Sequence, residues 1–222
     1  MDLLTNLIYI SQLSLLPVIP KTNSNYSNEE IKQIIFGSLL GDGKLELSAK
    51  SKNARFGFIQ SIIFKDYFLF IFSILKPFCL SNFRTYYYSD KRTSKTYVSL
   101  NFWTRALPIF TEFYNIFYIG KEKIVPLCLS LLTPLALAHW IMQDWAKASS
   151  GGLYLCTDLY TPEDTKRLAK YLHDKFKLEV TTPKAPGSNG ALRIYVKVSS
   201  MVLLRSLVIG HMHPSMIYKL GL

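Results

Sequence analysis

An internal duplication restricts the fold of this chain more than any other feature. Residues 29–41 place apolar side chains at helical spacing and lead into the acid Asp42. Residues 134–144 form a second apolar stretch, rich in small residues, that ends in Asp144. The two acids are separated by close to half of the 222 residues. Self-similarity at such a period predicts two copies of one folding unit.

The segments that follow the two acids correspond as well. After Asp42 we expect strands at 55–61, 82–89 and 96–103 and helices at 62–76 and 105–117, with one further strand allowed directly after the acid. After Asp144 we expect strands at 152–157, 178–182 and 191–198 and helices at 162–176 and 201–209. This order predicts an α+β fold with antiparallel strand pairing in each half.

The pattern divides the chain into four parts. Residues 1–27 form an N-terminal arm, 28–120 the first half, 121–133 a linker and 134–222 the second half. The first 20 residues are apolar, but they lack a basic start and a small-residue cleavage site, and polar residues interrupt them. We therefore expect neither a secretory signal nor a membrane partner.

The net charge points to a class of partner. The chain carries 26 Lys and Arg against 15 Asp and Glu, a formal charge of +11. Lysine and arginine release condensed counterions when they neutralise phosphates, so this charge favours a nucleic acid. An ordinary basic protein or a neighbour of the ribosome would carry a similar charge.

The two acids are candidates for a shared metal site. If the helices that precede them pack side by side, both carboxylates arrive at the same end of the pair. Small residues on both helices would permit this close approach: Gly37, Ser38, Gly41, Ala136 and Ala138. Paired carboxylates suit Mg²⁺, which prefers oxygen ligands and can activate water for phosphodiester hydrolysis. Either acid alone would more simply end a helix or begin a turn, but the duplication favours the metal site.

The two helices resemble the motifs of the LAGLIDADG homing endonuclease family. Ile-Phe-Gly-Ser-Leu-Leu-Gly-Asp-Gly at 35–43 is similar to the first motif, and Leu-Ala-His-Trp-Ile-Met-Gln-Asp-Trp at 137–145 is similar to the second. Residues 132–140 are especially similar to the second motif of single-chain members from fungal and algal organelles. The resemblance covers roughly residues 28–220. Each motif alone is degenerate, whereas the pair with its repeated surroundings is specific.

The resemblance implies both a fold and an activity. The fold would be two αββαββα-type halves related by a pseudo-twofold axis, with the motif helices at the central interface. The two antiparallel sheets would form a saddle on double-stranded DNA. The activity would be that of an enzyme, a monomeric endonuclease dependent on Mg²⁺ or Mn²⁺ that cuts both DNA strands during intron homing. The location would be an organelle, with the mitochondrion favoured.

The resemblance also implies site residues. Asp42 and Asp144 would bind the metals, and Gly41 and Gln143, the positions directly before them, would complete the metal set. The basic residues that assist catalysis would be Lys123 and Lys219, which stand at equivalent points of the two repeats, with Lys121 as a substitute for Lys123. Either lysine could instead be a solvated surface charge.

Three residues of the second half depart from the family pattern. Gln143 and Trp145 flank Asp144 where the family often has Asp and Gly. We expect Gln143 to remove a charge beside the metal and the indole of Trp145 to crowd the active site. Asp158 stands where similar proteins often carry Gln on the first strand of this half, and we expect it to repel phosphate.

The strands predict a face that reads DNA. Alternation places polar, basic and aromatic side chains on one face of three strands: Arg84, Tyr86 and Tyr88; Tyr97, Ser99 and Asn101; and Arg193, Tyr195 and Lys197. Leu192, Ile194, Val196 and Val198 fall on the other face of the last strand. Arg and Lys can bond guanine edges and Asn can pair with adenine in the major groove. Phosphate contacts are expected from Lys52, Arg55, Lys91, Arg92, Lys95 and Lys184. An ordinary solvent-exposed sheet would show the same alternation.

Three functions remain open at this point. The first is a site-specific DNA endonuclease, which the two acids favour. The second is an RNA-binding intron maturase, or another cleavage-deficient nucleic-acid-binding protein of the same fold, which Gln143 and Trp145 leave possible. The third is a structural protein that packs its basic faces on the RNA of a ribonucleoprotein.

Overall fold

The two halves have the same succession of helices and strands. The computed structural model describes residues 26–90, 92 and 94–222, so most of the expected N-terminal arm and Lys91 lie outside it. The first half consists of α2 (Asn28–Leu40), β1 (Lys44–Glu46), β2 (Arg55–Ser61), α3 (Lys65–Leu75), β3 (Arg84–Asp90), β4 (Lys95–Trp103) and α4 (Pro108–Phe117). The second consists of α5 (Pro134–Gln143), β7 (Trp145–Lys147), β8 (Leu153–Leu155), α6 (Pro162–Phe176), β9 (Val180–Thr181), β10 (Ile194–Val196) and α7 (Met201–Val208).

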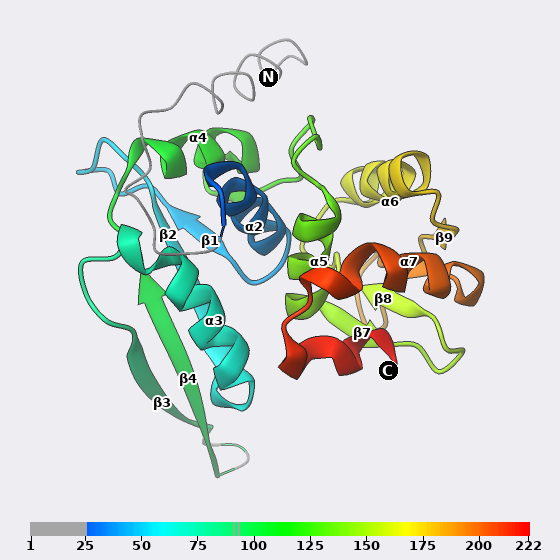
Figure 1. Cartoon of the computed structure of the whole chain (residues 1–222). Coiled ribbons are helices and arrows are strands. Elements are labelled where there is room, and N and C mark those ends of the chain that lie inside the picture. The colour runs from blue at the N-terminus through cyan, green and yellow to red at the C-terminus, as the bar shows by residue number, and fades with distance from the viewer. Residues whose placement is uncertain (1–25, 91, 93) are drawn as a thin grey trace.

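Each half folds into a four-stranded antiparallel sheet with the same strand order. The order is β1-β2-β4-β3 in the first half and β7-β8-β10-β9 in the second. β1 is the strand allowed for after Asp42, and β7 is its counterpart after Asp144, which the sequence pattern did not predict. α2 and α5 lie side by side between the two halves (Figure 1). The predicted α+β fold with two repeated halves is confirmed.

Small residues bring α2 and α5 to backbone contact. A Cβ atom on Gly37 would lie 2.1 Å from the carbonyl oxygen of Ala136, so this position must be glycine at the present helix separation. Ser38 is fully buried in the same interface. α5 begins sharply because the Thr133 hydroxyl accepts a hydrogen bond from the Ala136 amide and Pro134 fills the first turn. The two helices are therefore fixed in register and at close range.

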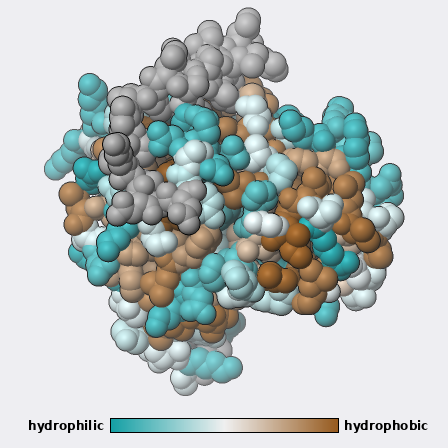
Figure 2. All heavy atoms as spheres, in the orientation of Figure 1, coloured by the Kyte–Doolittle hydropathy of each residue, from teal (hydrophilic) through white to brown (hydrophobic). Residues whose placement is uncertain are grey.

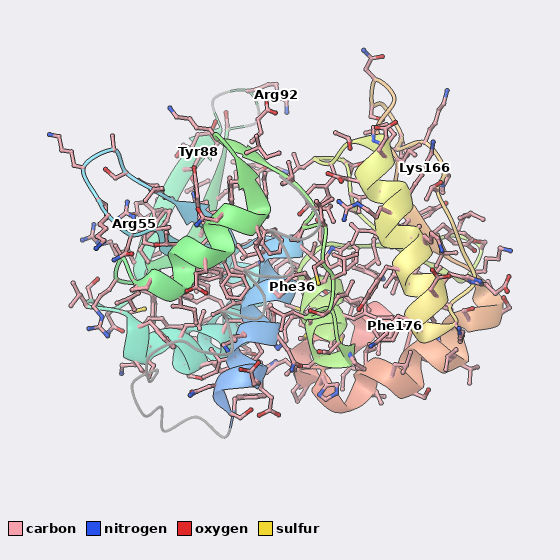
Figure 3. The ribbon with its side chains drawn as sticks, turned by 90° about the horizontal axis from the view of Figure 1, so that it is seen from above. Phe36, Arg55, Tyr88, Arg92, Lys166 and Phe176 are labelled. Carbon is pink, nitrogen blue, oxygen red and sulfur yellow. The ribbon has the colours of Figure 1, made fainter. Side chains whose placement is uncertain are left out.

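One face of each sheet is covered by helices and the other is open. In the first half Phe56, Phe58 and Phe102 point into the core, where Phe58 stacks on Phe68 of α3 at 6.0 Å between ring centroids. In the second half Leu153, Leu155, Ile194 and Val196 are buried under α6 and α7. Figure 3 shows Phe36 of α2 at the centre of the molecule, between the halves, and Arg55 and Tyr88 at the side of the first half.

The strands of the second half are shorter than the sequence predicted. The expected strand at 191–198 is β10, only three residues long, and Val198 lies in a 3-10 turn with 52% of its surface exposed. The expected strand at 178–182 shortens to Val180–Thr181, because Pro183 follows and has no amide hydrogen for a sheet ladder. The placement of Val198 on the buried face was wrong, since the chain leaves the sheet before it.

Several helix bounds also differ from expectation. The helix expected at 105–117 begins at Pro108, because Arg105 and Leu107 still donate backbone hydrogen bonds to Phe78 and Ala54. After α7, 3-10 helices follow as η4 (Ile209–His211) and η5 (Pro214–Leu220). Figure 2 shows apolar side chains gathered over this C-terminal region, and Val202 of α7 is 75% exposed there. Within the described ranges, none of the helices has the length and apolar character that a bilayer crossing requires.

Candidate active site

A cavity of about 370 Å³ opens where α2 and α5 end. Its walls are Gly41, Asp42, Gly43, Lys44, Lys123, Asp144, Cys156, Asp158 and Leu159. The two acids of the repeated helices thus line one cavity, as the packing of the helices required. The polar walls come from both halves and from the short ribbon of β5 (Tyr118–Ile119) and β6 (Glu122–Lys123) that connects them.

Two glutamines hold Asp42. The side-chain amide of Gln60 in β2 donates a short hydrogen bond to the Asp42 carboxylate. The backbone amide of Asp42 donates to Oε1 of Gln143 at 3.0 Å. Gln60 was not among the predicted site residues, although Phe56, Phe58 and Gln60 alternate on the buried face of β2 and could have revealed it. The carboxylate of Asp42 is therefore oriented by its own half and its backbone by the other half.

The side chain of Gln143 lies between the helices and not in the cavity. Its Nε2 donates to the Ser38 hydroxyl and to the Tyr67 hydroxyl, both at 2.9 Å, while Oε1 accepts from Asp42. Both the oxygen and the nitrogen of the Gln143 amide are therefore engaged in hydrogen bonds within the protein. The side chain also packs closely against Gly41, where an added Cβ atom would lie 2.8 Å from the Cβ of Gln143. The side-chain metal contact expected for Gln143 does not fit these contacts.

Both candidate lysines reach backbone carbonyls beside the acids. Nζ of Lys123 donates to the carbonyls of Gly41 at 3.2 Å and Gly43 at 2.9 Å. Nζ of Lys219, which is only 5% exposed, donates to the Met142 carbonyl at 2.5 Å. Each lysine thus binds main-chain carbonyls at the end of a motif helix. Lys121 is exposed and is not among the residues that line the cavity.

The four charged groups influence one another. Burial, together with the nearby negative charge of Asp42, raises the pKa of Asp144 to about 7, against the opposing effect of Lys123. Burial also raises the pKa of Asp42, while the hydrogen bond from Gln60 lowers it. Burial lowers the pKa of Lys123 to about 8, although both acids favour its charged form. The pair of carboxylates is thus incompletely neutralised by the protein.

These residues fit a hard divalent cation. The two carboxylates, both with a raised pKa, offer oxygen ligands and unbalanced negative charge in one cavity. Among the described residues there is no group of three or more His, Cys, Asp or Glu that could hold a metal. The remaining ligands would therefore be main-chain carbonyls, waters or substrate phosphates, which suits Mg²⁺ better than zinc.

Trp145 does not crowd the cavity, contrary to our expectation. The residue begins β7, and its φ is not in the left-handed region, so the chain needs no glycine here. Its indole packs edge-on against Tyr218 at 6.0 Å between centroids, and Nζ of Lys219 lies 5.9 Å from its ring. Trp145 is absent from the residues that line the cavity and instead supports the position of Lys219.

Asp158 is neutralised by a partner. The sequence suggested that Asp158 lies on the first strand of this half, but the residue lies in the turn after β8. Nε of Arg193 donates to its two carboxylate oxygens at 2.9 and 3.0 Å, and Nη2 donates at 2.7 Å. Because the guanidinium of Arg193 offsets its charge, Asp158 repels a phosphate less than we expected. The same ion pair leaves Arg193 less free to contact a guanine than we predicted.

The open face of the first sheet carries the predicted residues. The register pairs Arg84 with Asn101, Tyr86 with Ser99, and Tyr88 with Tyr97, so all six share one face. Tyr86, Tyr88 and Tyr97 are 47%, 66% and 52% exposed, which leaves these rings free for a ligand. Lys52, Arg92, Lys95 and Lys184 are also exposed, as expected for phosphate contacts.

Other predicted contacts are already engaged within the protein. Arg55 pairs with Glu46 at 3.0 Å and lies over the ring of Trp103, and Lys197 pairs with Glu179 at 3.2 Å. Tyr195 shares a hydrogen bond of 2.7 Å with Ser150. These pairs are solvent-exposed and weak, so a ligand can replace them at small cost.

The fold is that of the homing endonucleases. The solved structure of "the homing endonuclease I-WcaI bound to its DNA recognition sequence" is similar with a TM-score of 0.80 at 21% identity, over 94% of this chain and 97% of that chain. A mesophilic variant of the homing endonuclease I-DmoI is similar with a TM-score of 0.50 at 12% identity, over 82% and 96%. Residues 32–204 match the model of the LAGLIDADG DNA endonuclease family, and the chain belongs to that family.

The proteins with similar sequences include both maturases and an endonuclease. Cytochrome b mRNA maturase bI2 of Saccharomyces cerevisiae is 34% identical over 87% of this chain, and bI2 of Debaryomyces hansenii is 30% identical over 87%. DNA endonuclease I-ChuI of Chlamydomonas applanata is 28% identical over 87% of this chain and 95% of its own length. The chain spans 48% of the Saccharomyces protein and 74% of the Debaryomyces protein.

Proposed function

We propose that the chain is a site-specific DNA endonuclease that makes a double-strand break by metal-dependent phosphodiester hydrolysis. The observation that carries this proposal is the cavity in which Asp42 and Asp144, from two repeated helices, meet beside Lys123. Membership of a family described as DNA endonucleases and similarity to I-ChuI support it.

In this proposal each residue of the cavity has a distinct role. Asp42 and Asp144 would hold Mg²⁺ or Mn²⁺, and Gly41 and Gln143 would contribute only through their main-chain carbonyls. When bound, the metal supplies a polarised phosphate oxygen and a more acidic water. Lys123, whose pKa of about 8 leaves it able to hold or release a proton near neutrality, faces the phosphate. Lys219 fixes the end of α5 through the Met142 carbonyl.

The sheets would form the DNA-binding saddle. Their open faces would read the major groove with Arg84, Tyr86, Tyr88, Tyr97, Ser99, Asn101, Arg193, Tyr195 and Lys197. Phosphates would be held by Lys52, Arg55, Lys91, Arg92, Lys95 and Lys184. The binding of I-WcaI, a protein of the same fold, to its DNA recognition sequence supports this arrangement. Because one chain supplies both halves, we propose a monomer, acting in an organelle where cytochrome b introns are found, the mitochondrion.

Asparagine variants of the two acids test the proposal. A target is first obtained by selecting cleaved sites from a random DNA library with Mg²⁺ and the unaltered protein. We expect Asp42→Asn and Asp144→Asn each to abolish double-strand cleavage, because the amide cannot hold a metal against phosphate repulsion. Binding of the selected DNA should persist, since the basic sheets provide most of the affinity. Cleavage by both variants at the rate of the unaltered protein would refute the assignment of the metal site.

The second candidate function is an RNA-binding intron maturase. Two relatives named cytochrome b mRNA maturase, at 34% and 30% identity, favour it. Net charge does not separate the candidates, because both ligands carry phosphates. If no DNA in the library is cut while an intron transcript is bound tightly, the maturase function is preferred.

A further inference from the structure

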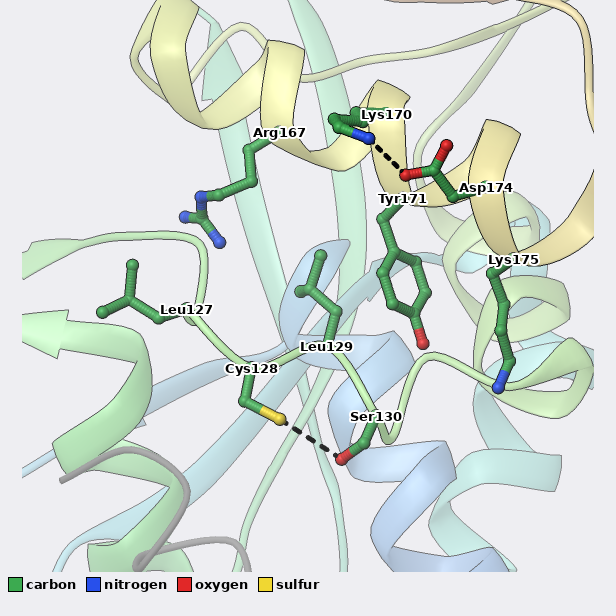
Figure 4. A pocket seen from close by; sticks show the side chains of 9 residues that line it. All are labelled: Leu127, Cys128, Leu129, Ser130, Arg167, Lys170, Tyr171, Asp174 and Lys175. Atoms are coloured by element: carbon green, nitrogen blue, oxygen red, sulfur yellow. Dashed lines mark hydrogen bonds and ion pairs between the residues drawn. The ribbon is translucent and has the colours of Figure 1, made fainter. Parts of the chain in front are cut away.

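A second cavity lies between the linker and α6 (Figure 4), and neither Asp42 nor Asp144 lines it. Its volume is about 480 Å³, and it is lined by the segment 127–130 on one side and by α6 side chains between Arg167 and Lys175 on the other. The segment 127–130 precedes the first turn of α5, whereas Asp144 follows the last turn. Ten helical residues at about 1.5 Å each place roughly 15 Å between the two sites.

This groove has an apolar floor with one aromatic wall. Leu127 and Leu129 come from the linker, and the ring of Tyr171 projects from α6 toward them (Figure 4). The Tyr171 hydroxyl makes no hydrogen bond to any residue that the structure describes. Burial raises the pKa of Tyr171, so its phenol stays neutral. The wall therefore offers both a flat ring and an unused polar group.

The rim of the groove is positively charged. The lining includes three basic residues, Arg167, Lys170 and Lys175, and one acid, Asp174, which Lys170 contacts at 2.5 Å. Lys175 forms no ion pair with any described residue. Arg167 is committed to Asp164 and to the Val125 carbonyl, so it closes one end of the groove and does not bind there. The free cation is thus placed beside the aromatic wall.

We propose that this groove binds an unpaired nucleotide of a single-stranded nucleic acid, with the base against Tyr171 and Leu129 and the phosphate at Lys175. Bases stack on exposed aromatic rings without regard to sequence, and lysine at the rim supplies the phosphate contact. The volume lies within the range of small-ligand sites. A duplex cannot use the groove, because its bases are stacked inside the helix.

The site is separate from the proposed active site. α6 covers the buried face of the second sheet, while Tyr154 and Tyr195 lie on the open face. A ligand in the groove and a DNA duplex on the sheets therefore occupy different sides of this half. The inference does not depend on cleavage, and an inactive DNA site would leave it intact.

Binding of labelled oligonucleotides tests the proposal. The probes are oligouridine RNA and oligothymidine DNA of about 15 nucleotides, a length suited to one such site, and a random DNA duplex. Tyr171→Ala should weaken single-strand binding on the order of tenfold, and Lys175→Ala should weaken it less and reduce its salt dependence by about one phosphate contact. Both variants should bind the duplex like the unaltered protein. The RNA and DNA probes identify which single strand is preferred.

Two controls keep the result interpretable. Lys166→Ala removes the same charge from the same helix, but Lys166 is exposed outside the groove, so single-strand binding should be unchanged (Figure 3). Tyr171→Phe keeps the ring and should retain most of the affinity. Equal loss for Lys166→Ala and Lys175→Ala, equal loss on duplex and single strand, or unchanged binding by Tyr171→Ala would each overturn the proposal. Binding of only an apolar peptide or of a second copy of the chain would overturn it as well.

Discussion

Gln143 stands directly before the second acid, yet its side chain serves the first one. The amide joins three groups that belong to the first half: the backbone of Asp42, the hydroxyl of Ser38 and the hydroxyl of Tyr67. Tyr67 in turn contacts Nδ1 of His139 at 3.1 Å, in a fully buried network. No described residue holds the backbone of Asp144 in the same way, since its amide donates to Trp140 as an ordinary helix end.

Gln143→Met should separate the positioning role of this amide from its packing. Methionine has similar length but cannot accept the Asp42 hydrogen bond, and it leaves Ser38 and Tyr67 without their partner. We expect the free energy of unfolding to fall by about 2–3 kcal/mol. Cleavage should slow on the order of tenfold to a hundredfold, because Asp42 loses its fixed position.

Strand-resolved kinetics on a labelled duplex provide the decisive measurement for Gln143→Met. One strand should be slowed more than the other, since only Asp42 depends on this bond. Equal slowing of both strands would indicate that the variant acts through overall stability. Gln143→Glu is the control that keeps the oxygen accepting from the Asp42 amide, although the bonds that Nε2 donates to the Ser38 and Tyr67 hydroxyls would have to reverse, and it should restore much of the difference between the strands.

The pKa of Asp144 predicts how stability depends on pH and metal. The folded value of about 7 is above the ordinary value near 3.9, so the contribution of this group to stability is full below about pH 4 and is lost as the pH rises through 7. The side chain of asparagine does not ionise, so the stability of Asp144→Asn does not fall with pH in this way. In EDTA at pH 8 the variant should therefore be more stable than the unaltered protein, by on the order of 4 kcal/mol, and the gap should close toward pH 4.

Thermal unfolding between pH 4 and pH 8, with EDTA or with Mg²⁺, checks this expectation. Added Mg²⁺ should raise the Tm of the unaltered protein at pH 8 but not that of Asp144→Asn, because a ligand stabilises only the state that binds it. A stability difference that is independent of pH would show that the burial of Asp144 has no energetic consequence. An equal Mg²⁺ effect on both proteins would place the metal elsewhere.

At the scale of elements, the contact between α2 and α5 is the most demanding. Gly37→Ala adds one methyl group where the nearest atom, the Ala136 carbonyl oxygen, is 2.1 Å away. The helices must separate to admit it, so we expect a loss of about 3 kcal/mol in the free energy of unfolding and a loss of cleavage as the acids move apart. Gly210→Ala is the matched control, since nothing lies within 4 Å of a Cβ there, and it should change stability by less than about 0.5 kcal/mol. Chemical denaturation gives the free energy of unfolding of both variants. Similar values for the two would mean that α2 and α5 are not close-packed in solution.

The elements that the sequence predicted best are those with strong local signals. α6 matches its expected bounds because Thr161, Pro162 and Glu163 start it and an amphipathic pattern continues it. The strands of the second half were overestimated, because alternation of apolar and polar residues continues beyond the point where neighbouring strands end. Strand length depends on a pairing partner, which a single segment does not encode.

At the scale of the whole molecule, the duplication was enough to predict the meeting of Asp42 and Asp144. It could not predict Gln60 or Tyr67, because their partners lie in other elements and no repeat marks them. The comparison with the family pattern misjudged Trp145 and Asp158, whose effects depend on Tyr218 and Arg193, residues far along the chain. A repeat predicts what the halves share, whereas these differences arise only when the halves are packed together.

The fit of Gln143 against Gly41 makes the two halves different from each other at their interface. The two positions are equivalent in the repeats, but Gln143 has a large side chain and Gly41 has none, so the glutamine fits into the space that the glycine leaves. In a pair of two second halves, a glutamine would meet a glutamine at this position. In a pair of two first halves, a glycine would meet a glycine and leave a gap. At this position the halves are therefore complementary and not interchangeable, so we expect that two identical halves would lose the close fit between α2 and α5.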